Sequence, residues 1–410
     1  METVEVNGRG YRAPERPVVV VCIDGGAPDY FSDGLSRGLL PALEGFRSRG
    51  FYATADCVVP SFTNPNNLSI VCGAPPAVHG IAGNFFLDPD TGEEVMMNEP
   101  RFLRAESILA AFSRLGKQVA IVTAKDKLRR LLGHGVKGAI CFSAEKAHEA
   151  TKAEHGIEDV NGLVGRETPD VYSAALSEFV MEAGVRLLEN HRPDLMYLSL
   201  TDYIQHKHAP GDAPADAFYR SLDRYWGRLD ELGAIVGLTA DHGMNAKMNN
   251  AGQPDILYLE PLLEEWLGAG RARVILPITD PYVVHHGALG SFATIYLDGD
   301  AGREKVQREL AALPGVEYVA GREEACGRFE LPGDRLGDLV VISGAHTVLG
   351  KSPEAHDLSA LGGVLRSHGG LAEQVVPFVL NVPLNEAYRE KAAAGLRNFD
   401  IVDCALNGTA

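Results

Sequence analysis

The sequence predicts an α/β fold with a mostly parallel sheet flanked by helices, and a small α+β domain inserted into it. Short β-branched runs alternate with stretches whose apolar residues recur every three or four positions, which is typical of an α/β core. The pattern of predicted strands and helices changes after about residue 249, which indicates the insertion. A chain of 410 residues is long enough for both parts.

Four runs are predicted to form the parallel strands of the core. The first, residues 17–24, is a continuous apolar run of the kind found in strands that are buried on both faces. The other strands are expected at residues 118–122, 194–200 and 234–240. Helical periodicity is present in residues 39–49, 104–115 and 172–189.

The inserted domain is predicted to cover residues 249–365. Its expected elements are strands at residues 291–297, 315–320 and 338–343 and a helix at residues 301–313. We assign His285, His286 and His346 to the structure or rim of this domain. A strand at residues 375–381 returns the chain to the core, which would consist of residues 1–248 and 366–410.

The composition excludes several classes of protein. A formal net charge of -17 argues against nucleic acid or an anionic membrane as a partner. No early apolar run approaches the ~20 residues that span a bilayer. The six cysteines are scattered without a CxxC motif, and no secretion signal is visible, so we expect reduced thiols and a cytoplasmic location. The sequence leaves a homodimer open.

Three of the predicted strands lead into an aspartate: Asp24, Asp202 and Asp241. Taken alone, each would be an ordinary turn or capping residue. In parallel sheets, however, ligands bind beyond the carboxyl ends of the strands. Three carboxylates at these ends therefore predict a site at one edge of the sheet.

Three histidines accompany the aspartates. His206 follows Asp202 by four residues, so one helical turn places both on the same face. His242 is adjacent to Asp241, and His368 precedes two glycines. Mixed carboxylate and imidazole ligands suit zinc better than magnesium or calcium. Two such ions ~3.5–4 Å apart can hold both the attacking and the leaving side of a phosphoryl group.

Thr63 is the predicted nucleophile. It lies where a helix is expected to begin, since Pro65 is tolerated in a first helical turn. A helix N-terminus favours an alkoxide or a phosphate, and a zinc ion would lower the pKa of the hydroxyl. The alternative is that Thr63 only caps the helix. Ser61 precedes the expected cap and Ser69 lies inside the helix, so both are weaker candidates.

These motifs, taken in order, resemble those of the alkaline phosphatase superfamily. They are Asp24-Gly25-Gly26, Ser61-Phe-Thr63-Asn-Pro, Thr201-Asp202-Tyr-Ile-Gln-His206, Thr239-Ala-Asp241-His242-Gly243-Met244 and His368-Gly369-Gly370. The resemblance covers nearly the whole chain. Within the superfamily it is strongest to the nucleotide pyrophosphatase/phosphodiesterase branch, and there to members that hydrolyse phosphonoacetate.

The resemblance implies an alkaline-phosphatase-like fold and two bound zinc ions. One ion would be held by Asp202, His206 and His368. The other would be held by Asp24, Asp241, His242 and the Thr63 oxygen. Whether iron or manganese replaces zinc is left open.

The resemblance also implies a substrate site. Asn84 resembles a residue that hydrogen-bonds a phosphonate oxygen, and Lys125 and Lys127 resemble residues that bind the substrate carboxylate. Residues two apart in an extended segment point to the same side, so the two lysines could converge on one anion. The alternative is a solvated basic loop paired with Asp126.

The implied activity is hydrolysis of the carbon–phosphorus bond of phosphonoacetate, a small anionic phosphonate, to acetate and phosphate. The alternative is a hydrolase of nucleotides or other phosphate esters with the same metals. Such an enzyme would need an aromatic slot, to which Tyr203 and Phe85 could contribute.

Overall fold

The computed structural model describes residues 2–279, 287–299, 302–359 and 361–409. Its core is a seven-stranded sheet with the order β4-β19-β10-β3-β9-β7-β8. Neighbouring strands are parallel except for β19, which is antiparallel to β4 and β10. The strands are β3 (Val18–Cys22), β4 (Phe51–Asp56), β7 (Val119–Thr123), β8 (Ile140–Ser143), β9 (Leu195–Ser199), β10 (Ile235–Thr239) and β19 (Val375–Leu380). The predicted α/β class and its four parallel strands are confirmed.

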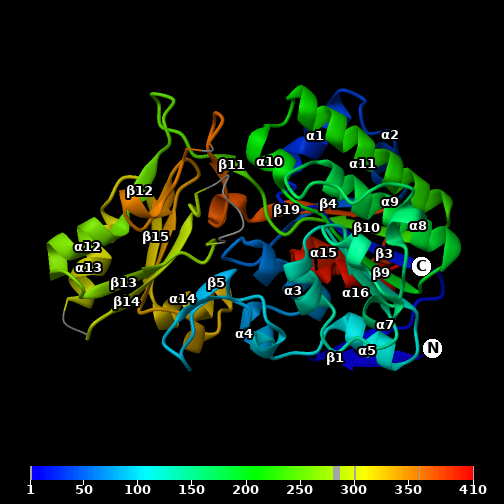
Figure 1. Cartoon of the computed structure of the whole chain (residues 1–410), viewed down its shortest axis with the longest axis horizontal. Helices are drawn as coiled ribbons and strands as arrows, with labels where there is room; N and C mark the ends of the chain where they lie inside the picture. The colour runs from blue at the N-terminus through cyan, green and yellow to red at the C-terminus, as the bar shows by residue number, and fades with distance from the viewer. Residues whose placement is uncertain (1, 280–286, 300–301, 360, 410) are drawn as a thin grey trace.

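Helices cover both faces of this sheet, so the central strands β3, β7, β9 and β10 are buried on both sides. In β3, Val18 and Val20 face one hydrophobic core, while Val19 and Val21 face the other. The first core is covered by α3 (Thr63–Cys72), α5 (Ile108–Arg114), α6 (Asp126–Leu132) and α16 (Ile401–Asn407). The second is covered by α1 (Pro28–Ser36), α2 (Pro41–Arg49), α9 (Ala175–Asn190) and α11 (Ala213–Glu231). Figure 1 shows the two layers below and above the sheet.

Shorter elements surround this core. They are β1 (Thr3–Val6), β2 (Arg9–Arg12), α4 (Pro76–His79), β5 (Phe85–Leu87), β6 (Glu94–Met96), α7 (Lys152–His155), α8 (Val160–Val164), α10 (Tyr203–Lys207) and α15 (Glu386–Ala393). No helix in the described part of the chain is long and apolar enough to cross a bilayer.

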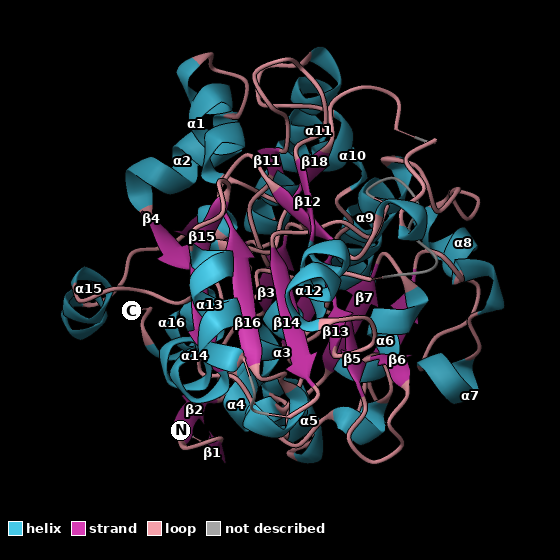
Figure 2. Ribbon diagram, turned by 90° about the vertical axis from the view of Figure 1, so that its left-hand side faces the viewer, coloured by secondary structure: helices cyan, strands magenta, loops and turns pink. Residues whose placement is uncertain are grey.

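A second sheet lies beside the core and forms the cap (Figures 1 and 2). It is antiparallel, with the order β13-β14-β16-β15. Its elements are α12 (Leu259–Leu267), β13 (Ala272–Ile275), β14 (Phe292–Leu297), α13 (Arg303–Ala311), β15 (Val316–Gly321), α14 (Arg322–Phe329) and β16 (Leu339–Ser343). The expected strands and helix of the insertion are thus present, while His285 and His286 lie outside the described residues.

The chain leaves and re-enters the core side by side. β11 (Asn245–Ala246) pairs with β18 (Arg366–Ser367), and β12 (Ile256–Tyr258) pairs with β17 (Val348–Gly350). The position of the β11–β18 pair supports the domain limits at 248/249 and 365/366, which remain a proposal.

An aromatic contact joins the core to the cap. Phe62, directly before α3, belongs to the hydrophobic core of the cap and is fully buried. Its ring lies edge-on to Phe292 of β14, with centroids 6.5 Å apart, and edge-on to His368 at 5.5 Å. The start of α3 is therefore fixed against the cap.

Candidate active site

The structure brings the three aspartates together at the carboxyl edge of the sheet. Asp24, Asp202 and Asp241 follow the adjacent strands β3, β9 and β10, and all three are buried. The potential metal-ligand atoms form two groups, and within each group they all lie within 4.8 Å of one another. One group is Asp24, Asp241 and His242, and the other is Asp202, His242 and His368. His206 Nε2 is 2.8 Å from Asp202 Oδ2. All six residues predicted from the strand ends therefore meet at one place.

Each of the three imidazoles has its Nδ1 held by a backbone carbonyl. The partners are Arg366 O for His206 at 2.7 Å, Gly243 O for His242 at 2.8 Å, and Ser61 O for His368 at 2.8 Å. An Nδ1–H that donates to a carbonyl leaves the Nε2 lone pair for a metal. Carbonyl-oriented imidazoles of this kind are common in zinc sites.

Unsatisfied polar atoms provide a test of the metal prediction. Among the described residues, Asp24 Oδ1 and His242 Nε2 are buried without a hydrogen-bond partner, although they lie 3.2 Å apart. Buried polar atoms without partners are costly, so native proteins satisfy them. The carboxylate and imidazole donors fit a borderline cation such as zinc, and the residues present fit the predicted ions.

The pKa values of the cluster report the same need for positive charge. Burial opposes a charge on His242, but Asp241 and Asp24 raise its pKa to about 10. Burial and the neighbouring Asp24 raise the pKa of the Asp241 carboxyl well above its usual value. Both shifts have the same physical cause, which is negative charge gathered in a site removed from water.

The division of ligands between two ions is less distinct than the resemblance implies. His242 belongs to both groups of ligand atoms, and its ring stacks on that of His368 with centroids 3.5 Å apart and an interplanar angle of 6°. The rings of His206 and His368 are 5.7 Å apart. The assignment of each ligand to one ion therefore remains a prediction.

Thr63 is the first residue of α3, and the capping position belongs to Phe62, whose backbone is extended. The interpretation of Thr63 as a simple cap is therefore wrong. The rival hydroxyls are engaged elsewhere: Ser61 Oγ donates to Gly370 O at 2.9 Å, and Ser69 Oγ is 2.8 Å from His79 Nε2. Thr63 alone of these three hydroxyl residues lines the cavity.

Asn67 is a supporting residue that the sequence analysis missed. Its Nδ2 donates to Asp241 Oδ2 at 3.2 Å and to Thr63 O at 3.0 Å. Its Oδ1 accepts from Tyr197 Oη at 2.8 Å and Ser199 Oγ at 2.9 Å. Asn67 follows Thr63 by four residues, so helical spacing could have placed it on the same face.

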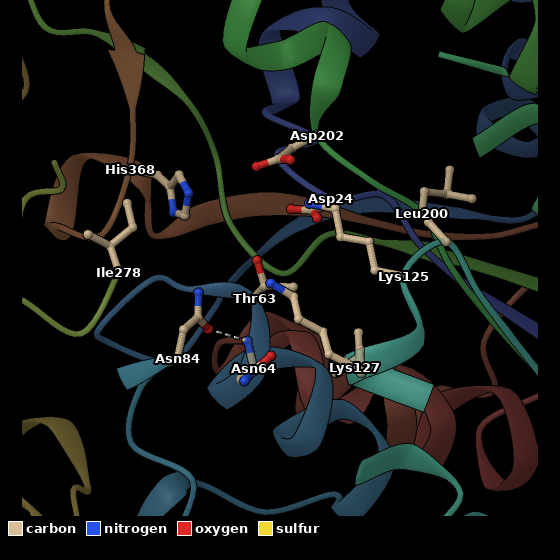
Figure 3. A pocket seen from close by; sticks show the side chains of 12 residues that line it. Asp24, Thr63, Asn64, Asn84, Lys125, Lys127, Leu200, Asp202, Ile278 and His368 are labelled. Carbon is tan, nitrogen blue, oxygen red and sulfur yellow. Dashed lines mark hydrogen bonds between the residues drawn. The ribbon is translucent and has the colours of Figure 1, made fainter. Parts of the chain in front are cut away.

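A small cavity of about 40 Å³ opens above these groups, lined by Asp24, Thr63, Asp202 and His368 and by the predicted substrate residues. The Oδ1 atom of Asn84 accepts from the backbone N–H of Asn64 at 3.0 Å. Figure 3 shows the amide nitrogen of Asn84 on the side that faces the cavity. Asn84 can therefore donate to an anion there.

Both predicted lysines line the cavity, but they do not lie in one extended segment as expected. Lys125 precedes α6 in extended backbone, whereas Lys127 lies in the first turn of the helix. Asp126 forms ion pairs with Arg129 at 2.6 Å and Arg130 at 3.8 Å. These pairs do not match the alternative interpretation, in which Asp126 is paired with the lysines in a solvated loop. Burial, followed by the nearby Lys125 charge, lowers the pKa of Lys127 to about 7. Figure 3 shows both side chains reaching toward Thr63 and Asp24.

Comparisons with known proteins agree with this geometry. Crystal structures of phosphonoacetate hydrolase from Sinorhizobium meliloti 1021, in complex with phosphonoformate and with phosphonoacetate, are 56% and 55% identical to this chain. Both alignments cover 100% of this chain and 99% of that chain, with TM-scores of 0.95 and 0.94. Murine ectonucleotide pyrophosphatase/phosphodiesterase 5 is 18% identical over 96% of both chains, with a TM-score of 0.64, and shares the fold.

Two curated relatives match a shorter segment. An ectonucleotide pyrophosphatase/phosphodiesterase of Caenorhabditis elegans is 34% identical over 113 residues, which is 26% of this chain and 14% of that relative. An uncharacterized pyrophosphatase/phosphodiesterase of Schizosaccharomyces pombe is 37% identical over 86 residues, 20% of this chain and 16% of that relative. The matched segment thus spans less than a fifth of either relative.

A model of the type I phosphodiesterase / nucleotide pyrophosphatase family matches residues 18–370, which include most of the core, the cap and every predicted ligand. Together with the full-length likeness to phosphonoacetate hydrolase, this match shows that the chain belongs to the type I phosphodiesterase / nucleotide pyrophosphatase family of the alkaline phosphatase superfamily.

Proposed function

We propose that this protein hydrolyses the carbon–phosphorus bond of phosphonoacetate to acetate and phosphate, with Thr63 as nucleophile and two zinc ions as cofactors. The observation that carries the proposal is the pair Lys125 and Lys127, which lines the same small cavity as Thr63 and Asn84. Likeness to a phosphonoacetate hydrolase crystallised with phosphonoacetate supports this substrate.

The reaction begins at the N-terminus of α3. Bound zinc ions would supply the positive charge that favours ionised Thr63 and offsets the charge of the phosphonate. Thr63 Oγ attacks phosphorus, and the helix N-terminus favours the negative charge that gathers there. Asn84 donates its amide N–H to a phosphonate oxygen. The first step forms a phosphothreonine at Thr63.

The leaving group is the difficult part of the reaction. When the carbon–phosphorus bond breaks, its electron pair passes to the methylene carbon and spreads into the adjacent carboxylate. Lys125 and Lys127 face that carboxylate and stabilise its growing charge more in the transition state than in the ground state. Protonation of the carbon gives acetate, and water then cleaves the phosphothreonine to phosphate and free Thr63.

The lining of the cavity favours a small anion over a nucleotide. Neither Tyr203 nor Phe85 is among the described residues that line it, and Tyr203 instead accepts a hydrogen bond from Lys207 at 3.1 Å. The aromatic slot of the phosphodiesterase alternative is therefore not formed by these residues.

A cytoplasmic location is part of the proposal. All six cysteines are free thiols, in keeping with a reducing compartment.

Replacing Thr63 by Ala is expected to lower turnover of phosphonoacetate by roughly 10³-fold or more, because the nucleophile is lost. The zinc content should stay nearly unchanged, since the aspartates and histidines remain. The measurements are phosphate release and elemental analysis of the purified protein. Thr63→Ser is the matched control and should keep part of the activity. An active Thr63→Ala protein would exclude this nucleophile.

Replacing Lys125 or Lys127 by Ala should reduce kcat/KM for phosphonoacetate by about 10²–10³-fold, the usual cost of one lost donor to a developing anion. Hydrolysis of a nitrophenyl phosphate ester should fall far less, because its leaving group carries no carboxylate. Lys146→Ala, which removes a lysine outside this cavity, serves as the control. Equal losses on both substrates would remove the carboxylate role.

Replacing His368 by Ala should release at least one metal ion, because a ligand with a buried, carbonyl-oriented ring is lost. Elemental analysis after dialysis measures the zinc per chain. His134→Ala, a change at an exposed histidine, should retain the wild-type content. Full zinc occupancy in His368→Ala would contradict the ligand assignment.

A further inference from the structure

A fully buried ion pair lies directly behind the metal-binding edge. Lys247 Nζ and Glu373 Oε1 are 2.8 Å apart, and both side chains have 0% exposure. A buried pair of this kind is weak evidence for stability, because removing both charges from water is costly. Neither residue lines the cavity, so substrate binding does not account for the pair.

Glu373 is hydrogen-bonded to two of the loops that carry predicted zinc ligands, those of His242 and His368. Its Oε2 accepts from the backbone N–H of Gly370 at 3.0 Å, two residues after His368. Its backbone carbonyl accepts from Gly243 N–H at 2.7 Å, directly after His242. One residue thus holds the two loops at a set separation.

Lys247 closes this arrangement into a ring of contacts. Its Nζ also donates to Ser291 Oγ at 2.8 Å, and the backbone N–H of Ser291 donates to His368 O at 2.9 Å. Ser291 directly precedes β14. The ring therefore runs from Glu373 through Gly370 and His368 to Ser291 of the cap, and returns through Lys247.

The separation of the two loops matters because their imidazoles are in contact. The rings of His242 and His368 stack at 3.5 Å. A shift of either loop would push one ring against the other and move an Nε2 away from the carboxylates.

We propose that Glu373, held by Lys247, is a positioning residue that fixes His242 against His368 and thereby sets the zinc affinity. This inference rests on the proposed function, since it assumes that the two histidines hold zinc. Glu373 acts through the loops and does not touch the substrate. Asn245 supports it by donating its Nδ2 to Glu373 Oε1 at 2.7 Å.

Glu373→Gln tests the proposal, because it keeps the size of the side chain and removes the charge. Zinc affinity is measured by competition with a chromogenic chelator, and the melting temperature of the metal-free protein is measured in parallel. We expect zinc binding about 10–100-fold weaker than in the wild type, the usual effect of disturbing a group that orients metal ligands.

Asp403→Asn is the matched control. Asp403 is also a buried carboxylate paired with a lysine, Lys391 at 2.6 Å, but its other partners are not predicted ligands; they are Arg9, Tyr388 and Asn407. This variant should lower the melting temperature and keep the wild-type zinc affinity. A purely structural role of Glu373 would give the same pattern for Glu373→Gln.

The double variant Lys247→Met/Glu373→Gln decides the question if the single variant does not fold, since removing both charges of a buried pair is often tolerated. Weaker zinc binding in the folded double variant supports the proposal. Wild-type affinity in the folded single or double variant overturns it. If the wild-type protein itself bound no zinc, the proposed function would fail instead, so the two failures are distinguishable.

Discussion

The mutual repulsion of buried carboxylates is the constraint on which this site depends. Asp24, Asp202 and Asp241 follow neighbouring parallel strands and are almost wholly removed from water. Their charges cannot all persist there unless cations or protons lie between them. The parallel order of β9, β3 and β10 creates this repulsion, because it brings the carboxyl ends of three strands to one edge of the sheet. The same order makes the edge a candidate metal site.

The proposed nucleophile Thr63 and the histidine His368 share one wall of the site. Gly369 has a φ of +122°, and a Cβ atom there would lie 2.4 Å from Phe62 Cε1. Only glycine allows this close approach without a shift of the aromatic ring. Phe62 in turn immediately precedes Thr63 and packs into the cap core. The cap thus helps to fix the positions of both Thr63 and His368 through Phe62.

Much of this site could be predicted from the sequence because local patterns carry it. Asp24, Asp202 and Asp241 stand at strand ends, and His206 follows from helical spacing. The contact of His242 with His368 could not be predicted, because it joins residues 126 positions apart through the return from the cap. The ion pair of Lys247 and Glu373 could not be predicted, because a sequence does not distinguish a buried lysine from an exposed one. Lys125 and Lys127 line one cavity, but the turn into α6 brings them there and not an extended segment. Their convergence on one anion stays a prediction.

Under the proposed function, the cavity must stabilise negative charge in two places, at phosphorus and at the substrate carboxylate. A phosphate ester and a phosphonate would both need the aspartate and histidine edge, because both would present charged phosphorus oxygens to Thr63. They differ at the bond that breaks: an ester releases an oxygen, which holds negative charge well, whereas phosphonoacetate releases a carbon, which does not. The charge must therefore move away from phosphorus to the carboxylate. Lys125 and Lys127 lie at the start of α6, an element separate from those that carry the predicted ligands. Substrate choice can thus change at α6 while the chemistry at phosphorus is preserved.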